Sequence, residues 1–150
     1  MTGTRPSGTV SEDDVLVRAA RTFVGISVRA ADQLGPVSLV QLRALTVIDE
    51  ADGANLLQLS DSLGVTVSTA SRLVDRLVSA GFVDRRPSEM TRREITLSLT
   101  AQGQDLLSHY DDIRLQALHR RLDQLPRRRR TAVIDALDHL VSTAVPPQDA

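Results

Sequence analysis

The chain has 150 residues, of which 41% are hydrophobic, and its formal net charge is −1 at pH 7. This length fits one domain or two small lobes, and the apolar fraction is enough to bury a core. Cysteine is absent, which excludes disulfides, thiolate metal sites and a cysteine-based redox switch. No apolar run is long enough to span a bilayer, and residues 1–10 lack the apolar core of a signal peptide. We therefore expect a cytoplasmic protein with no membrane partner.

Two helices are predicted in the first third of the chain. Residues 1–10 are small, polar and proline-bearing, which predicts a disordered tail. The run SEDD that follows resembles a capping box and predicts a helix over residues 11–34, ended by a Gly-Pro pair. Ser38 predicts the cap of a second helix, which extends to about residue 48.

The next segment has the pattern of a helix-turn-helix. Asn55 is a good N-cap for the short helix LLQLSDSL, and Gly64 ends it because the position after a helix favours the left-handed conformation. Val65 is expected to pack inward, and Thr66 to cap the second helix. Two helices that cross closely need a small residue at the crossing, and Ser60 supplies one.

The second helix of this motif is amphipathic. At 100° per residue one wall is apolar, with Val67, Ala70, Leu73, Val74, Leu77 and Val78. The opposite wall carries Ser68, Thr69, Arg72, Asp75, Arg76 and Ser79. The apolar wall should dock on a core, so the polar wall faces outward, where it suits a DNA groove. An ordinary surface helix shows the same amphipathicity, so the neighbouring segments decide between the two interpretations.

A basic hairpin is predicted directly after this helix. Residues 82–86 and 94–99 have the alternation of two short strands, and the loop between them is flanked by Arg85 and Arg86 and ends in Arg92 and Arg93. Residues 65–93 hold six arginines and three acids, a local charge of +3 that leaves −4 for the rest of the chain. A near-neutral total therefore does not argue against DNA binding, because phosphates are neutralised at the contact face.

The C-terminal third predicts two long helices. Thr100 caps a helix over residues 101–122, and Pro126 suits the first turn of a helix over residues 126–145, before a second tail at 146–150. Both carry apolar stripes that a small lobe cannot cover, so they and the first helix are expected to pair across a two-fold axis in a homodimer. The four arginines at 127–130 are interpreted as a solvated face that pairs with Asp123 or Asp135, and contact with DNA or with an acidic partner is the alternative.

The run over residues 56–103, including LGVTVSTASRLVDRLVSAGFVDRRPS and LSLTAQG, resembles the MarR family of winged helix-turn-helix regulators. The resemblance covers nearly the whole chain. It implies a mainly α fold with a small β-hairpin wing, in which a winged helix-turn-helix lobe over about 38–99 joins a helical dimerisation lobe. A single MarR-like domain then spans residues 11–145.

The resemblance further implies a homodimer that binds double-stranded DNA at a pseudo-palindromic operator. The implied DNA-binding residues are Thr66, Ser68, Thr69, Ser71, Arg72, Arg76, Arg92 and Arg93. Ser68, Thr69, Arg72 and Arg76 are placed at the major groove, and the wing arginines at the minor groove or phosphates. Family members often carry Asp-x-Arg at the wing tip, where this chain has Thr91, Arg92 and Arg93, so the bracing acid is missing. Glu89 or Glu94 could replace it.

Repression released by a small aromatic or lipophilic effector is the commonest behaviour that the resemblance implies. The effector would bind in a cleft between the dimer helices and the winged lobe, where the candidate polar groups are Arg18, Arg21, Arg29 and Tyr110. No cofactor is expected. The three histidines, His109, His119 and His139, lack the spacing of a helical metal pair, so no metal site is predicted.

Two other classes of function compete with this interpretation. The chain has no Gly-x-Ser-x-Gly, no phosphate-binding glycine loop and no His-Glu-x-x-His, so catalysis is not expected. An adaptor or anti-repressor that acts through protein contacts could share the fold, but it would have no need of outward arginines. A protein that coats chromosomes without sequence preference would be more basic overall.

Overall fold

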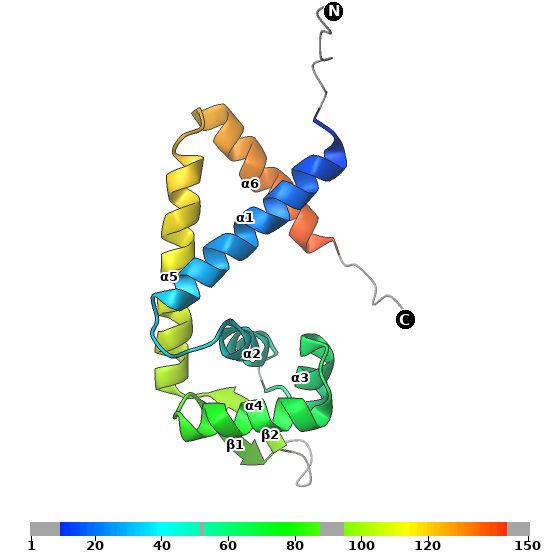
Figure 1. The fold of residues 1–150 in the computed structure, drawn as a ribbon, viewed down its shortest axis with the longest axis vertical. Helices are drawn as coiled ribbons and strands as arrows, with labels where there is room; N and C mark the ends of the chain where they lie inside the picture. Colours follow the sequence, from blue (N-terminus) through cyan, green and yellow to red (C-terminus); the bar gives the residue numbers. More distant parts are fainter. Residues whose placement is uncertain (1–9, 52, 88–94, 144–150) are drawn as a thin grey trace, which may run out of the picture. The chain divides into compact units, whose positions relative to one another are not determined.

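The computed structural model describes residues 10–51, 53–87 and 95–143, which form helices and one two-stranded hairpin (Figure 1). The elements are α1 (Glu12–Asp32), α2 (Leu39–Glu50), α3 (Leu56–Leu63), α4 (Val67–Ser79), β1 (Val83–Pro87), β2 (Ile95–Leu99), α5 (Ala101–Leu122) and α6 (Arg127–Ser142). The predicted fold class and the order of its elements are confirmed. The chain divides into two compact units, and the boundary between them lies within α5, after Arg114. None of the described helices is both long and apolar enough to cross a membrane.

The predicted N-caps are present. Ser38 and Asn55 each form a full capping box, with Gln41 and Gln58 as the reciprocal side chains. At Ser11 the structure shows one half of the expected box, in which the hydroxyl accepts a bond of 3.1 Å from the N–H of Asp14. These bonds satisfy amide groups that a helix start otherwise leaves unpaired.

Some helix ends differ from the predicted ones. The helix predicted over residues 11–34 ends at Asp32, because the amides of Gln33 and Leu34 bond three residues back and tighten the last turn. Pro126 stands just before α6 rather than in its first turn. Strand β1 begins one residue later than predicted, because the N–H of Phe82 closes the end of α4 on the carbonyl of Leu77, at 2.9 Å. The predicted start of the second strand, residue 94, lies outside the described residues.

An aliphatic core holds the helix-turn-helix to the hairpin. Its buried members come from α2, the α2–α3 connection, α3, α4, β1 and β2: Ala44, Leu45, Ile48, Ala54, Leu59, Val74, Leu77, Val83 and Leu97. Each fully buried Leu, Ile or Val stabilises the fold by about 1.5–3 kcal/mol. A second cluster, Ala30, Ala31, Leu42, Leu107 and Tyr110, packs α1, α2 and the first half of α5 together.

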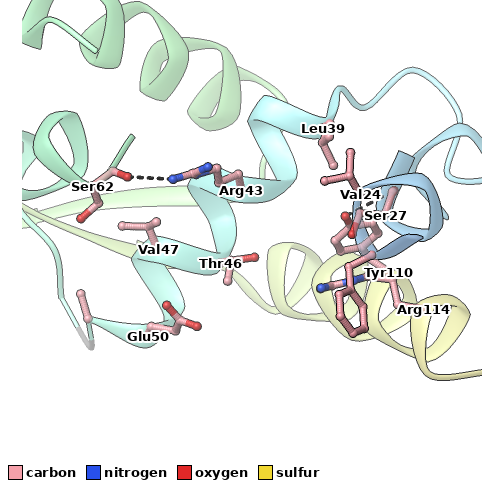
Figure 2. A pocket seen from close by; sticks show the side chains of 12 residues that line it. Val24, Ser27, Leu39, Arg43, Thr46, Val47, Glu50, Ser62, Tyr110 and Arg114 are labelled. Carbon is pink, nitrogen blue, oxygen red and sulfur yellow. Dashed lines mark hydrogen bonds between the residues drawn. The ribbon is translucent and has the colours of Figure 1, made fainter. Parts of the chain in front are cut away.

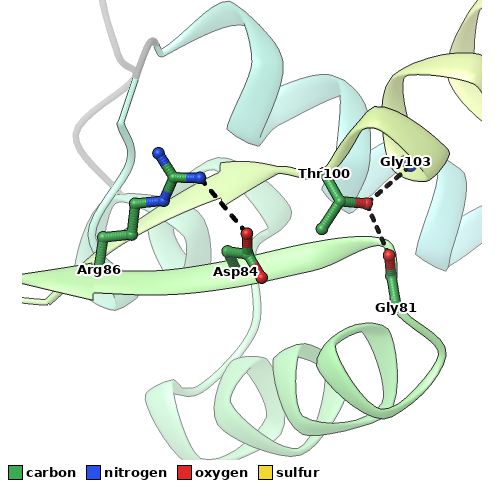
Figure 3. Close-up of polar contacts among 5 residues, drawn as sticks. All are labelled: Gly81, Asp84, Arg86, Thr100 and Gly103. Carbon is green, nitrogen blue, oxygen red and sulfur yellow. Dashed lines mark hydrogen bonds and ion pairs between the residues drawn. The ribbon is translucent and has the colours of Figure 1, made fainter.

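The hairpin is held along one edge, by Ala54, and at its open end, by the start of α5. Its strands are antiparallel, with Val83 opposite Leu99, and the amide of Leu97 donates to the carbonyl of Ala54 at 2.8 Å. The first turn of α5 closes on the other end of the wing, where the hydroxyl of Thr100 donates to the carbonyl of Gly81 at 2.6 Å and accepts from the N–H of Gly103 at 3.0 Å (Figure 3). Thr100 is thus the cap that the sequence predicts, and it also joins α5 to the end of α4.

Candidate nucleic-acid interface

The turn between α3 and α4 has the predicted geometry. Gly64 adopts a φ of +65°, and the amide of Val65 donates to the carbonyl of Ser60 at 3.0 Å. Thr66 caps α4 by accepting from the N–H of Thr69 at 3.2 Å, and the two threonine hydroxyls lie 3.0 Å apart. Ser60 is 1% exposed, as expected for a small residue where the two helices pack.

The two walls of α4 are largely as predicted. Ala70, Val74 and Leu77 are buried, and all six residues of the predicted polar wall are exposed. The prediction that Val67 is buried with the apolar wall is wrong, because its side chain is 45% exposed. As the first residue of α4, it lies beyond the edge of the core that covers the following turns. Ser71, which the resemblance places among the DNA-binding residues, is half-buried.

Among the described residues of this surface, Arg72 and Arg76 are cations that no acid neutralises. They lie one turn apart on α4, and neither has an acidic partner within the part of the chain that the structure describes. An ordinary structural role for Arg76, an ion pair with an acid near Asp75, therefore has no support among these residues, and Asp75 itself pairs with Arg85. Both arginines line a shallow groove against the start of α2, which also includes Ser38 and Val40.

Two ion pairs neutralise the remaining described charges of this surface. Arg85 on β1 contacts Asp75 on α4 at 2.5 Å. Arg86 lies 3.5 Å from Asp84 on the same strand, and Figure 3 shows this second pair. The side chains are about half exposed, so each pair contributes at most about 1 kcal/mol. The first pair nevertheless links the wing to α4. Sequence reasoning missed it, because ten residues and a change of element separate the partners.

The tip of the wing lies outside the described residues. Arg92 and Arg93 belong to this part of the chain, as do Thr91 and the candidate bracing acids Glu89 and Glu94. Their assignment to DNA contact stays a prediction.

A cavity of about 880 Å³ that is wide open to solvent lies behind the helix-turn-helix, among α1, α2, the end of α3 and the first half of α5 (Figure 2). It is lined by Phe23, Val24, Ser27, Leu39, Arg43, Thr46, Val47, Glu50, Ala51, Ser62, Tyr110 and Arg114. Of the four candidate effector residues, Tyr110 lines it. Arg18 and Arg21 border a separate shallow pocket on α1, and Arg29 borders neither.

Two arginines of this cavity were missed by sequence reasoning. Arg43 donates to the backbone carbonyl of Ser62 at 3.1 Å, two residues before the turn that leads into α4 (Figure 2). Arg114 lies 5.0 Å from the centre of the Tyr110 ring and bonds Asp111 at 2.9 Å. Periodicity alone could not show that these side chains face one space, because they come from different helices.

The second unit confirms one predicted pair. Arg130 at the start of α6 contacts Asp123 at 3.1 Å, and Arg127, Arg128 and Arg129 are exposed, as a solvated face requires. The three histidines of the chain are also exposed, and no group of three potential metal ligands occurs in residues 10–51, 53–87 and 95–143.

Sequence comparison finds similarity to one family of regulators and to individual helix-turn-helix proteins. The sequence profile of the MarR family matches residues 37–95. The HTH-type transcriptional regulator Mb0904 of Mycobacterium bovis is 30% identical over 107 residues, which are 71% of this chain and 75% of that protein. YfiV of Bacillus subtilis, also an HTH-type transcriptional regulator, is 26% identical over 104 residues, and the match spans 69% of this chain and 65% of YfiV.

Solved structures show the same architecture. The crystal structure of RV1404 from Mycobacterium tuberculosis superimposes with a TM-score of 0.79 at 29% identity, covering 97% of this chain and all of that one. A mutant form of MarR from E. coli shares the fold at 20% identity, with a TM-score of 0.74 over 90% of this chain and 99% of its own. On this evidence the chain belongs to the MarR family of helix-turn-helix transcriptional regulators.

Proposed function

We propose that the protein is a repressor that binds a pseudo-palindromic operator as a homodimer in the cytoplasm and is released by a small-molecule effector. The observation that carries this proposal is the outward wall of α4, where Arg72 and Arg76 stand exposed without an acidic partner among the described residues. A helix of this kind fits the major groove, and arginine bonds guanine edges or phosphates there.

The proposed DNA contacts follow from position along α4. Ser68 and Thr69 lie in the first turn, where hydroxyls and free amides meet phosphates or base edges. Arg72 and Arg76 are assigned to bases or backbone one and two turns further on. Thr66 holds the start of the helix, and half-buried Ser71 is assigned a peripheral contact. Arg92 and Arg93 complete the predicted set from the wing.

The homodimer is proposed from apolar surface that the chain leaves uncovered. On α1, Leu16, Val17 and Val24 are 46–58% exposed, and α6 buries none of its residues and exposes Leu140 and Val141 at 62% and 76%. Surface of this kind marks protein contacts. Two recognition helices about 34 Å apart would read half-sites one helical turn apart, so the symmetry of the dimer predicts that of the operator.

Selection of bound sequences from random duplex DNA tests this function. We expect an enriched inverted repeat, bound by a dimer with an affinity that falls steeply between 50 and 200 mM salt, by about 10³-fold or more if six or more phosphates are contacted. Absence of enrichment, or weak binding indifferent to sequence, would contradict the proposal and favour an adaptor that acts through protein contacts.

We assign the effector to the cavity of about 880 Å³ behind the helix-turn-helix. Phe23, Val24 and Val47 offer an apolar wall, and Arg43 offers a guanidinium that now bonds the carbonyl of Ser62. A ligand carboxylate on Arg43 would compete with that carbonyl, which lies just before the turn into α4. A ligand in the cavity would thereby favour one position of α4 over another. An effector can change operator affinity only by binding one conformation of the protein more tightly than the other.

Arg43→Ala is expected to abolish the preference of this cavity for anionic ligands, because the other arginine of the cavity, Arg114, already pairs with Asp111. A hydrogen bond to a charged group contributes about 1.5–3 kcal/mol. We therefore expect 2-naphthoate to raise the melting temperature of the parent protein more than its neutral amide does, and the difference to vanish in the variant. Arg18→Ala, outside the cavity, is the control and should keep the preference. An equal preference in parent and Arg43→Ala would remove Arg43 from the site.

A further inference from the structure

Val67 is an apolar side chain that the fold leaves uncovered at the tip of α4. It is the first residue of the helix, and it is 45% exposed although its sequence position predicts burial. The N-terminal residues of a recognition helix are the ones that reach base edges in the major groove. Val67 therefore lies where base contact is expected, between the cap Thr66 and the exposed Ser68.

The chemistry of valine restricts what it can contact there. The major-groove edges of guanine, adenine and cytosine present donors and acceptors, whereas thymine adds a C5-methyl group. An isopropyl group that displaces water from a donor or acceptor leaves that group unpaired, which is unfavourable, whereas contact with a methyl buries apolar surface on both sides. The contact that suits Val67 is therefore a thymine methyl.

The backbone around Val67 holds this side chain in place. Thr66 accepts from the amide of Thr69, and its hydroxyl lies 3.0 Å from the Thr69 hydroxyl, so the first turn is fixed by its own cap. A β-branched side chain in a helix keeps one strongly preferred χ1 rotamer. The isopropyl group is thus pre-organised, and little conformational entropy is lost when DNA covers it.

We propose that Val67 is a specificity-determining residue that reads the C5-methyl group of one thymine in each operator half-site. This inference rests on the proposed operator binding and adds to it the chemical identity of one base. Val67 would then discriminate thymine from cytosine at a single position, beside the base and phosphate contacts assigned to the hydroxyls and arginines of α4.

Removal of that methyl from the DNA tests the assignment. Each thymine of the selected half-site is replaced in turn by deoxyuridine, in both half-sites, and the duplexes are titrated with the parent protein and with Val67→Ala. At one position we expect the parent to lose about fourfold in affinity per half-site, roughly 15-fold for the dimer, as one buried methyl implies. Val67→Ala should bind thymine and uracil duplexes equally at that position.

Val28→Ala is the matched control. Val28 is another exposed valine of the same compact unit, 40% exposed, and it lies on α1 rather than on the surface formed by α4 and the wing. It should keep the full sensitivity to uracil. A second measurement replaces the critical thymine by cytosine or 5-methylcytosine, where the methyl should restore about fourfold per half-site in the parent and nothing in Val67→Ala.

The outcomes separate this inference from the function on which it rests. If an operator is bound tightly but uracil weakens the parent and Val67→Ala equally at every position, Val67 reads no methyl and the inference is overturned. If Val28→Ala loses the sensitivity as Val67→Ala does, the effect is not specific to Val67 and the inference is again overturned. If no operator is enriched at all, the proposed function itself fails.

Discussion

The Arg72→Ala protein is expected to bind the selected operator about 1–3 kcal/mol more weakly at each half-site, and up to roughly 6 kcal/mol more weakly as a dimer that has lost both arginines. The reason is geometric and electrostatic. Arg72 is exposed on the outward wall of α4, and within the described residues no acid holds its guanidinium away from DNA. Titration of the folded variant against the operator and against an unrelated duplex measures the loss.

The same titrations show which part of the DNA Arg72 contacts. A base contact predicts that discrimination is lost at one position, whereas a phosphate contact predicts uniform weakening and a salt slope smaller by about one per site. Arg18→Ala removes the same charge from α1 and should leave operator affinity within about twofold, because Arg18 belongs neither to α4 nor to the wing, where the phosphate and base contacts are expected. Unchanged affinity in Arg72→Ala would contradict the assignment.

Gly103→Ala is expected to destabilise the fold by about 2 kcal/mol. Gly103 is buried in the first turn of α5, and a methyl group at its Cα would overlap the carbonyl oxygen of Phe82. That carbonyl cannot move away easily, because it accepts a hydrogen bond of 3.0 Å from the amide of Thr100. The backbone must therefore shift. The free-energy cost of this shift exceeds the gain of about 1 kcal/mol that alanine brings over glycine in helix propensity.

Urea unfolding of Gly103→Ala beside Gly25→Ala measures this effect. Gly25 is also helical, but a methyl group there meets only the flexible guanidinium of Arg29 at 3.5 Å. Gly25→Ala should therefore leave the free energy of unfolding unchanged or raise it by up to about 1 kcal/mol. Equal midpoints for the two variants would show that the close approach at Gly103 relaxes without loss.

The helix-turn-helix could be predicted from sequence because its signals are local. A cap at Asn55 or Thr66 and a left-handed glycine at Gly64 each act within a few residues of the helix end that they fix, so the spacing of residue types is enough. Val67 shows the limit of this reasoning. The helical projection places it beside Val74, but whether a core reaches that far along the helix is a tertiary fact.

Contacts between elements were beyond sequence reasoning for a similar reason. The bond from Arg43 to Ser62 joins two helices, and the pair of Asp75 with Arg85 joins a helix to a strand. The second pair also changes the electrostatic interpretation. The sequence assigns six arginines and three acids to residues 65–93, but Asp75 and Asp84 hold Arg85 and Arg86. Within the described residues, the positive face is therefore narrower than the charge count implies.

The bonds around Thr100 restrict how the winged lobe can move. Its amide donates a hydrogen bond to the carbonyl of Phe82, and its hydroxyl donates to the carbonyl of Gly81 and accepts from the N–H of Gly103. Gly103 also packs so closely on the carbonyl of Phe82 that a Cβ would not fit between them. Because these hydrogen bonds and this close approach fix the first turn of α5 to the start of the wing, the two cannot hinge against each other. A rearrangement that changes the distance between two recognition helices must carry the first turn of α5 along as one body with α4 and the wing. The flexibility that such a rearrangement requires has to reside elsewhere in the chain.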